Sequence, residues 1–174
     1  MKYLVIVLVV GIVSCSSNKY FIVRHAEKAV VSKDSVNMMT NNPPLSEAGK
    51  VRAFVLRDEL RSQHIQRIFS TNTIRTISTA QPLNEAMGTA IELYNPSKDS
   101  MDAFIGKLKA IKTNVLVIGH SNTVDDLVNK LTGRTDVPGD LADGDYDNLF
   151  IITRKGKKMI FERKKYGYPS NPDK

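Results

Sequence analysis

Short apolar runs alternate along the chain with segments of helical period. The clearest runs are Tyr20 to Val23 and Val115 to Ile118, and shorter ones cover Arg67 to Ser70 and Ile91 to Tyr94. Apolar runs of this length between turn signals are typical of strands that are buried on both faces. Their alternation with helices predicts an α/β fold, a three-layer sandwich with a mostly parallel central sheet and helices on both faces.

Apolar residues recur at helical spacing between these strands. The predicted helices run from Leu45-Ser46 to about Ser62, from Thr71 or Asn72 to about Met87, from Asp99 to Ile111, and from Ser121 or Asn122 to Gly133. The second of them carries Arg75 in its first turn. After the last helix, Leu149 to Thr153 and Met159 to Glu162 flank Lys155-Gly156, which predicts a hairpin. The segment from Ala29 to Pro44 has no period and predicts a loop that overhangs the site.

The first residues have a pattern of their own. Lys2 precedes ten apolar residues, Leu4 to Val13, a run too short for the roughly 20 residues that span a bilayer. The run ends at Cys15 in a sequence that looks like a bacterial lipobox. We therefore expect a lipoprotein signal peptide over residues 1–15, a tether over 16–19, one domain over 20–165 and a flexible tail over 166–174. The expected location is the bacterial cell envelope, on the outer membrane or the periplasmic face, with the lipid membrane as a partner through acylated Cys15.

Composition narrows the chemistry. The 174 residues suit one domain with its own core, and Cys15 is the single cysteine, so the mature fold has neither a disulfide nor a thiolate nucleophile. The net charge is +7, and the surplus gathers in residues 154–158 and 163–165 without an aromatic-rich groove. We interpret these residues as a solvated hairpin end and a basic tail, and we expect no nucleic-acid partner.

Cationic side chains follow three of the predicted strands. Arg24-His25 ends the first strand, His120 follows Gly119 at the end of the central strand, and Arg75 lies just beyond the third. Open α/β sheets bind ligands at the carboxyl ends of their strands. Two imidazoles and two guanidinium groups at that edge indicate a site for a phosphate group.

With these residues the sequence resembles the histidine phosphatase superfamily, the phosphoglycerate-mutase-like enzymes, from about Lys19 to about Thr153. The resemblance rests on Arg24-His25, on the segment from Ser70 to Thr76 around Arg75, and on Gly119-His120, in this order. The chain departs from the family at Ala26, where a glycine is usual. An added methyl narrows the accessible backbone conformations but removes no reacting group.

The resemblance implies a metal-independent phosphatase that hydrolyses phosphomonoesters of small molecules. His25 is then the nucleophile that forms a phosphohistidine, and Arg24 and Arg75 bind the phosphoryl oxygens. His120 completes the clamp, as a second cation if it is protonated. Asn122 either binds the phosphate or caps its helix. No cofactor or metal is expected, because the alternating Asp143, Asp145 and Asp147 lack the glycine and glutamate of a calcium-binding loop.

Two questions stay open from the sequence. The first is the general acid, for which Glu27 and Asp145 are equal candidates, because one follows His25 and the other precedes a strand. The second is the function class. The alternatives are a non-catalytic anion- or partner-binding surface lipoprotein on the same fold and a phosphoglycerate mutase. The absence of a clear acidic loop between Arg75 and Asp99 weakens the mutase alternative, and the nucleophilic imidazole argues against a pure binding module.

Overall fold

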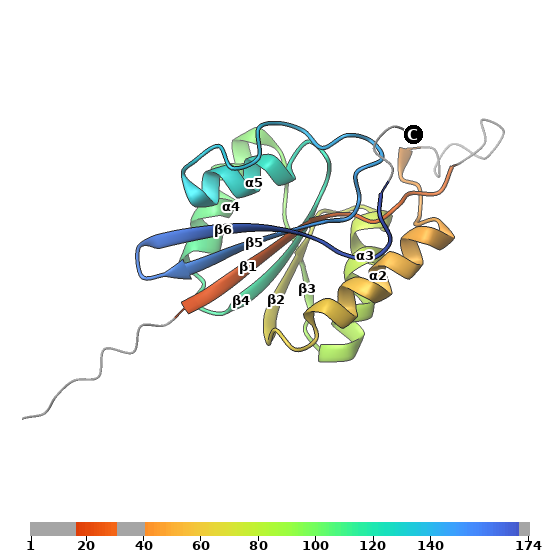
Figure 1. The fold of residues 1–174 in the computed structure, drawn as a ribbon, viewed down its shortest axis with the longest axis horizontal. Coiled ribbons are helices and arrows are strands. Elements are labelled where there is room, and N and C mark those ends of the chain that lie inside the picture. Colours follow the sequence, from red (N-terminus) through yellow and green to blue (C-terminus); the bar gives the residue numbers. More distant parts are fainter. Residues whose placement is uncertain (1–16, 31–40, 171–174) are drawn as a thin grey trace, which may run out of the picture.

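A six-stranded sheet forms the centre of the molecule. The computed structural model describes residues 17–30 and 41–170 (Figure 1). The predicted signal peptide, Cys15 and Ser16 lie outside the described residues, as do residues 31–40 and 171–174. The strand order is β3-β2-β4-β1-β5-β6. The strands are β1 (Ser17–Arg24), β2 (Ile65–Ser70), β3 (Ile91–Leu93), β4 (Asn114–Gly119), β5 (Asn148–Lys155) and β6 (Lys158–Lys165).

Four of the six strands are parallel. β1 pairs with β4, β4 with β2 and β2 with β3, all in parallel, whereas β5 runs antiparallel to both β1 and β6. The mostly parallel sheet and the terminal hairpin that the sequence predicts are therefore confirmed. The parallel strands place all their carboxyl ends at one edge of the sheet.

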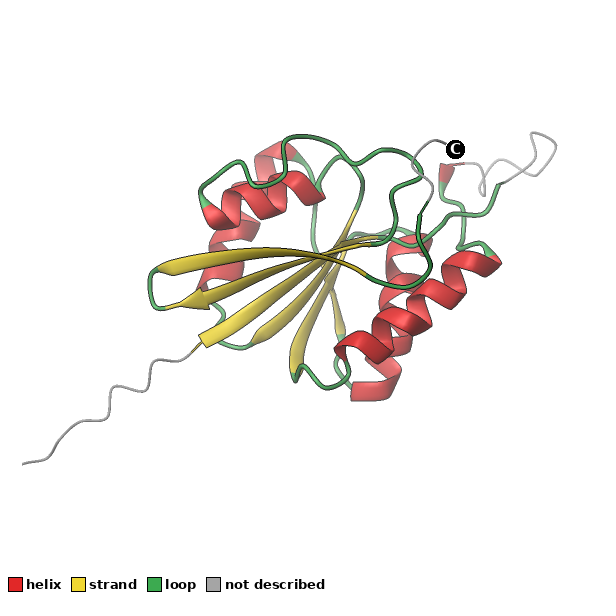
Figure 2. Ribbon diagram, in the orientation of Figure 1, coloured by secondary structure: helices red, strands yellow, loops and turns green. Residues whose placement is uncertain are grey.

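Helices cover both faces of the sheet (Figure 2). The helices are α2 (Glu47–Leu60), α3 (Ile74–Met87), α4 (Lys98–Ala110) and α5 (Val124–Thr132). Along β1, Tyr20 and Ile22 pack into the core under α4 and α5, while Phe21 and Val23 pack into the core under α2 and α3. Successive side chains of a strand point to opposite faces, so an unbroken apolar run serves two cores. The three-layer sandwich is confirmed.

Some element boundaries differ from the sequence-based prediction. The N-cap of α3 is Thr73, whose side chain accepts a hydrogen bond from the Thr76 amide, in place of Thr71 or Asn72. The N-cap of α5 is Thr123 in place of Ser121 or Asn122. The residues expected as caps instead lie in the turns between strand and helix. These turns are longer than expected, and they leave room for a site at the edge of the sheet.

Both ends of the predicted domain extend further than expected. β1 begins at Ser17, which pairs with Lys155, so most of the predicted tether is strand. The segment from Tyr166 to Ser170 is packed against the domain and is not a flexible tail. The buried Arg52 guanidinium donates hydrogen bonds to the carbonyl oxygens of Tyr166 and Tyr168, at 2.9 and 3.0 Å. A buried guanidinium needs several acceptors, and this segment supplies two of them. Among the described residues, no helix is both long and apolar enough to cross a membrane.

Candidate active site

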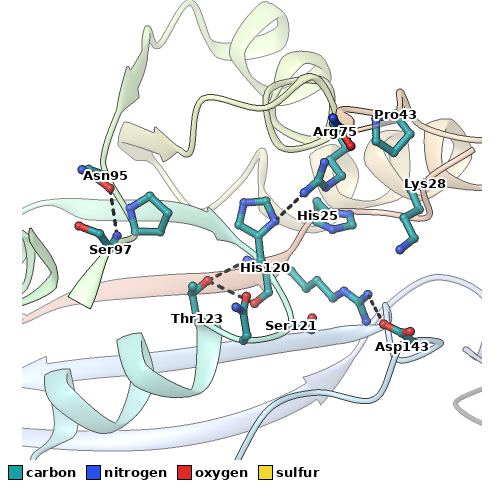
Figure 3. A pocket seen from close by; sticks show the side chains of 14 residues that line it. His25, Lys28, Pro43, Arg75, Asn95, Ser97, His120, Ser121, Thr123 and Asp143 are labelled. Atoms are coloured by element: carbon teal, nitrogen blue, oxygen red, sulfur yellow. Dashed lines mark hydrogen bonds and ion pairs between the residues drawn. The ribbon is translucent and has the colours of Figure 1, made fainter. Parts of the chain in front are cut away.

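The two predicted histidines and Arg75 come together at the carboxyl edge of the sheet (Figure 3), and Arg24 lines the same cavity. Arg24 is the last residue of β1, and the register of β1 with β4 places it opposite Gly119. The next backbone N–H, that of His25, donates to the carbonyl oxygen of Gly119 at 2.9 Å. The His25 and His120 rings then meet edge to face, with their centroids 5.4 Å apart. Arg75, in the first turn of α3, points to the same place.

His25 is held in one tautomer. Its Nδ1 lies 2.7 Å from the carbonyl oxygen of Ala26. A carbonyl oxygen only accepts, so Nδ1 carries the proton and Nε2 keeps its lone pair. Nε2 has no hydrogen-bond partner among the described residues. Burial is the main cause that lowers the pKa of His25 from 6.5 to about 3; the hydrogen bond to Ala26 opposes this shift, and the positive charges of Arg24 and Arg75 add to it. The imidazole is therefore neutral at pH 7, as a nucleophile requires.

His120 is held in the opposite tautomer. Arg75 Nη2 lies 3.4 Å from its Nδ1, and Thr71 Oγ1 lies 2.8 Å from its Nε2. A guanidinium only donates, so Nδ1 is the acceptor and the Nε2–H donates to Thr71. Burial, followed by the charges of Arg75 and Arg24, lowers the pKa of His120 to about 4. His120 is thus neutral at pH 7, and it is not the second cation that the sequence considered.

Arg24 is fixed by the loop before β5. Its side chain is buried, and its Nη1 donates to the carbonyl oxygen of Ala142 at 2.7 Å. The guanidinium carbon lies 4.1 Å from the ring centroid of Tyr146, which is a cation–π contact. Nη2 lies 3.8 Å from the exposed carboxylate of Asp143. Burial lowers the pKa of Arg24, but an arginine keeps its charge in proteins.

These groups line an open cavity of about 760 Å³. Arg24, His25, Arg75 and His120 form its floor. The remaining lining is mostly polar and comprises Lys28, Asn41, Pro43, Asn95, Pro96, Ser97, Ser121, Asn122, Thr123 and Asp143. Asn122 is exposed and lies in the lining of the cavity. The N-cap of α5 is Thr123, so the prediction that Asn122 caps this helix is wrong. A polar cavity with two guanidinium groups at its floor fits a phosphorylated, hydrophilic molecule.

Neither predicted general acid lines this cavity. The Glu27 carboxylate accepts hydrogen bonds from Arg52 Nε and Nη2, at 2.9 and 2.6 Å. The Asp145 carboxylate pairs with Lys165 at 3.1 Å and with Arg163 at 3.5 Å. Arg52 belongs to α2, and Arg163 and Lys165 belong to β6. The sequence does not show that these elements lie beside the two carboxylates. In place of an acid role, the structure gives both carboxylates ion pairs outside the cavity.

Several residues of the site escaped the sequence analysis. Thr71, considered only as a cap, orients His120, and Tyr146 supports Arg24. Asp143 lines the cavity, although the sequence analysis considered it only as part of a rejected calcium-binding loop. Tyr146 and Asp143 both lie in the loop that leads into β5, the strand beside β1, and this position is the one sequence signal that could have identified them. No group of three His, Cys, Asp or Glu side chains that could hold a metal ion is present among residues 17–30 and 41–170.

Comparison with known proteins agrees with this architecture. The model of the Histidine phosphatase superfamily (branch 1) matches residues 20–96, a range that includes Arg24, His25 and Arg75. No curated protein sequence matches the chain. Many solved structures share its fold, and together with the family match they identify the fold as that of the histidine phosphatases.

Three of these structures illustrate the similarity. The protein histidine phosphatase SixA in complex with tungstate is 19% identical, with a TM-score of 0.66, and the match covers 84% of this chain and 96% of that one. The ecdysone phosphate phosphatase from Bombix mori with tungstate is 15% identical, with a TM-score of 0.61 and coverage of 88% and 95%. A mycobacterial glucosyl-3-phosphoglycerate phosphatase with inorganic phosphate is 13% identical, with a TM-score of 0.59 and coverage of 84% and 95%. At these identities the likeness concerns the fold.

The low pKa of His25 predicts that acid destabilises the protein. In the unfolded chain this imidazole takes up a proton near its ordinary pKa of 6.5, whereas in the folded protein it stays neutral until about pH 3. Protonation therefore favours the unfolded chain across this window, and the stability present above pH 6.5 is lost as the pH falls. Between about pH 7.5 and about pH 5, His25 alone removes about 2 kcal/mol from the free energy of unfolding.

Urea titrations at the two pH values measure this difference. His25→Asn should lose about 2 kcal/mol less than wild type over the same interval. His64→Asn is the matched control, because His64 is exposed at the opposite end of the sheet, and it should keep the wild-type pH dependence. The same pH dependence in His25→Asn and in wild type would contradict the assignment of a neutral, buried imidazole.

Proposed function

We propose that the chain is a metal-independent phosphatase that hydrolyses phosphomonoesters through a phosphohistidine on His25. The observation that carries this proposal is the free lone pair of His25 Nε2, which has no hydrogen-bond partner among the described residues, in a cavity that Arg24 and Arg75 also line. A binding module needs the cations but has no use for an imidazole whose proton is held at Nδ1 by the Ala26 carbonyl oxygen, 2.7 Å away. The solved complexes of SixA and of the ecdysone phosphate phosphatase hold tungstate, a tetrahedral oxyanion, which supports a similar site here.

The reaction proceeds in two displacements. In the first, Nε2 of His25 attacks phosphorus, the P–O ester bond breaks, and the leaving alkoxide takes up a proton from water in the open cavity. In the second, water attacks phosphorus, the P–N bond breaks, and the products are inorganic phosphate and the neutral imidazole. Splitting one difficult displacement into two lowers the barrier of each. The bond from Nδ1–H to Ala26 stabilises the positive charge that the ring acquires as it attacks.

The cations act on the transferring group. Arg24 and Arg75 hold the non-bridging oxygens, which keep most of their negative charge in a loose transition state. Arg24 is positioned for this by Ala142 and Tyr146, and Arg75 by the first turn of α3. An incoming dianion also offsets the repulsion by Arg75 and Arg24 that, after burial, lowers the pKa of His120, so this ring takes up a proton more readily once substrate is bound.

The nucleophile is tested by substitution and by trapping. His25→Ala should lower kcat by roughly 10⁴-fold or more, because His120 is the only other imidazole among the described residues that line the cavity, and both of its ring nitrogens have partners. Wild type quenched during turnover should carry an acid-labile phosphate on the peptide that contains His25. A panel of phosphomonoesters that includes an aryl phosphate, assayed with and without a chelator, provides the substrates. His64→Ala is the control and should keep full activity, and an active His25→Ala protein would exclude the mechanism.

The clamp is tested by a substitution that conserves charge. Arg75→Lys should reduce kcat by roughly 10²-fold or more, since an ammonium cannot reproduce the two-point contact of a guanidinium with phosphoryl oxygens. Lys164→Arg makes the converse change at an exposed residue of β6 and should be silent. If the two variants have equal activity, Arg75 does not hold transferring charge.

The proposed location is the cell envelope, with the chain anchored through acylated Cys15. The support is the sequence of residues 1–15, and the described fold begins directly after it, at Ser17. Cys15→Ser should move the protein out of the detergent phase in a phase-partition experiment, either as an uncleaved precursor or as a soluble form. The activity of the purified protein should stay the same, because Cys15 precedes the domain. Mass analysis that finds an unmodified Cys15 in the mature wild-type chain would rule out the anchor.

A further inference from the structure

A group of lysines occupies the end of the sheet that lies opposite the cavity. We call Lys19, Lys112, Lys155, Lys157 and Lys158 the basic end face. β1 begins beside the β5–β6 hairpin, since Ser17 pairs with Lys155. β4 begins just after Lys112, and its Asn114 side chain accepts a hydrogen bond from the Lys19 amide at 2.8 Å. Figure 1 shows the start of β1 and the hairpin turn at the same end of the sheet.

The charges of this face are not neutralised by the fold. Lys112, Lys155, Lys157 and Lys158 are exposed. None of the five lysines has a carboxylate within 4.0 Å in the part of the chain that the structure describes, whereas Lys50, Lys107, Lys130 and Lys165 each have at least one. The surrounding stretches, residues 17–26, 103–124 and 154–161, contain no Asp or Glu at all. Unpaired like charges at one end of a domain are suited to an extended anionic surface.

Buried contacts fix the lysines relative to one another. Arg154 is 7% exposed, and its guanidinium donates to the carbonyl oxygens of Lys109 at 2.6 Å and Ile111 at 3.0 Å. These bonds join the hairpin to the connection between α4 and β4, which carries Lys112. Asn18 adds a bond from its Nδ2 to the carbonyl oxygen of Thr113 at 3.2 Å. The end face is therefore a rigid base, not a set of independent loops.

We propose that the basic end face binds the anionic headgroups of the bilayer in which the chain is anchored. The choice of occupant rests on the proposed acylation of Cys15. Two residue steps separate Cys15 from Ser17, and an extended chain covers at most about 7 Å in two steps. The anchor therefore emerges from the middle of this face and holds it against the headgroups. Acyl chains together with a polybasic surface give stable membrane attachment, each lysine near the surface strengthening binding roughly fivefold.

This contact orients the enzyme. The cavity lies at the carboxyl ends of the parallel strands, and the end face lies at their amino ends, so the cavity points away from the bilayer. Substrate then enters from the aqueous side, and the lysines that bind the membrane take no part in the reaction. The positively charged residues 154–158, which the sequence analysis interpreted only as a solvated hairpin end, thereby acquire a function.

Lysine acetylation on vesicles tests the contact with the acylated full-length protein. The protein is reconstituted in phosphatidylcholine vesicles and in vesicles of equal parts phosphatidylcholine and phosphatidylglycerol, and acetylation is followed by peptide mass analysis. On the anionic vesicles, acetylation of Lys112, Lys155, Lys157 and Lys158 should slow at least roughly fivefold at low salt. It should recover at about 1 M salt, where the Debye length is about 3 Å. Lys50, Lys98 and Lys164, near the cavity end, should react equally on both vesicles.

Matched variants separate the face from net charge. In K155Q/K157Q/K158Q the protection of Lys112 should be lost, and in K50Q/K98Q/K164Q, which removes the same charge at the other end, it should persist. Equal acetylation on the two vesicle types, or equal loss of protection in the two variants, overturns the proposal. Intact mass reports acylation of Cys15 independently, and phosphatase assays of the same samples report the catalytic proposal. If Cys15 is not acylated, the same vesicles are added to the unacylated protein. Slower acetylation of the end-face lysines on the anionic vesicles then supports the contact, and equal acetylation on both vesicle types overturns it.

Discussion

The parallel pairing of β1 with β4 is the constraint on which the site depends. It places Arg24 opposite Gly119, and the hydrogen bond from the His25 amide to Gly119 continues the ladder one residue beyond the strands. Because the register is fixed by apolar side chains that fill both cores, the two histidines meet with little freedom. A shift of one residue would turn the side chains of β1 to the wrong faces and separate the imidazoles. The packing of the two cores thus determines how His25 and His120 are placed relative to each other.

The site brings two guanidinium groups and two imidazoles together in a largely buried region. The surrounding residues determine which of these groups carry a charge. Arg24 receives acceptors from Ala142 and the π face of Tyr146, and it lies near the Asp143 carboxylate. The two imidazoles respond in the other way, since burial and the neighbouring guanidinium groups hold both neutral. The site therefore combines fixed cations with two neutral imidazoles. Such an arrangement suits an oxyanion.

A second layer of contacts fixes the segment after His25. The Ala26 amide donates to Thr79 Oγ1 at 2.9 Å, and the same hydroxyl donates to the Arg75 carbonyl oxygen, so α3 positions both sides of the cavity. Glu27 binds Arg52, which also holds the C-terminal segment. α2 approaches so closely at Gly49 that a Cβ there would overlap the Glu27 carbonyl oxygen. Residues 25–27 are thus held by α3, by Arg52 and by the close approach of α2 at Gly49.

The sequence by itself determined the elements and the chemistry of their ends. Apolar runs and helical periods are local, so they predicted strands buried on two faces, helices on both sides, and an arginine and a histidine at the end of β1. Only the tertiary structure decided which charged groups face one another. Glu27 and Asp145 were candidate acids until α2 and β6 brought Arg52, Arg163 and Lys165 to them. In the same way Thr71 became the partner of His120, and residues 166–170 the partners of Arg52 and Asp147. Hydrogen bonds and ion pairs between distant segments depend on packing, which no local pattern encodes.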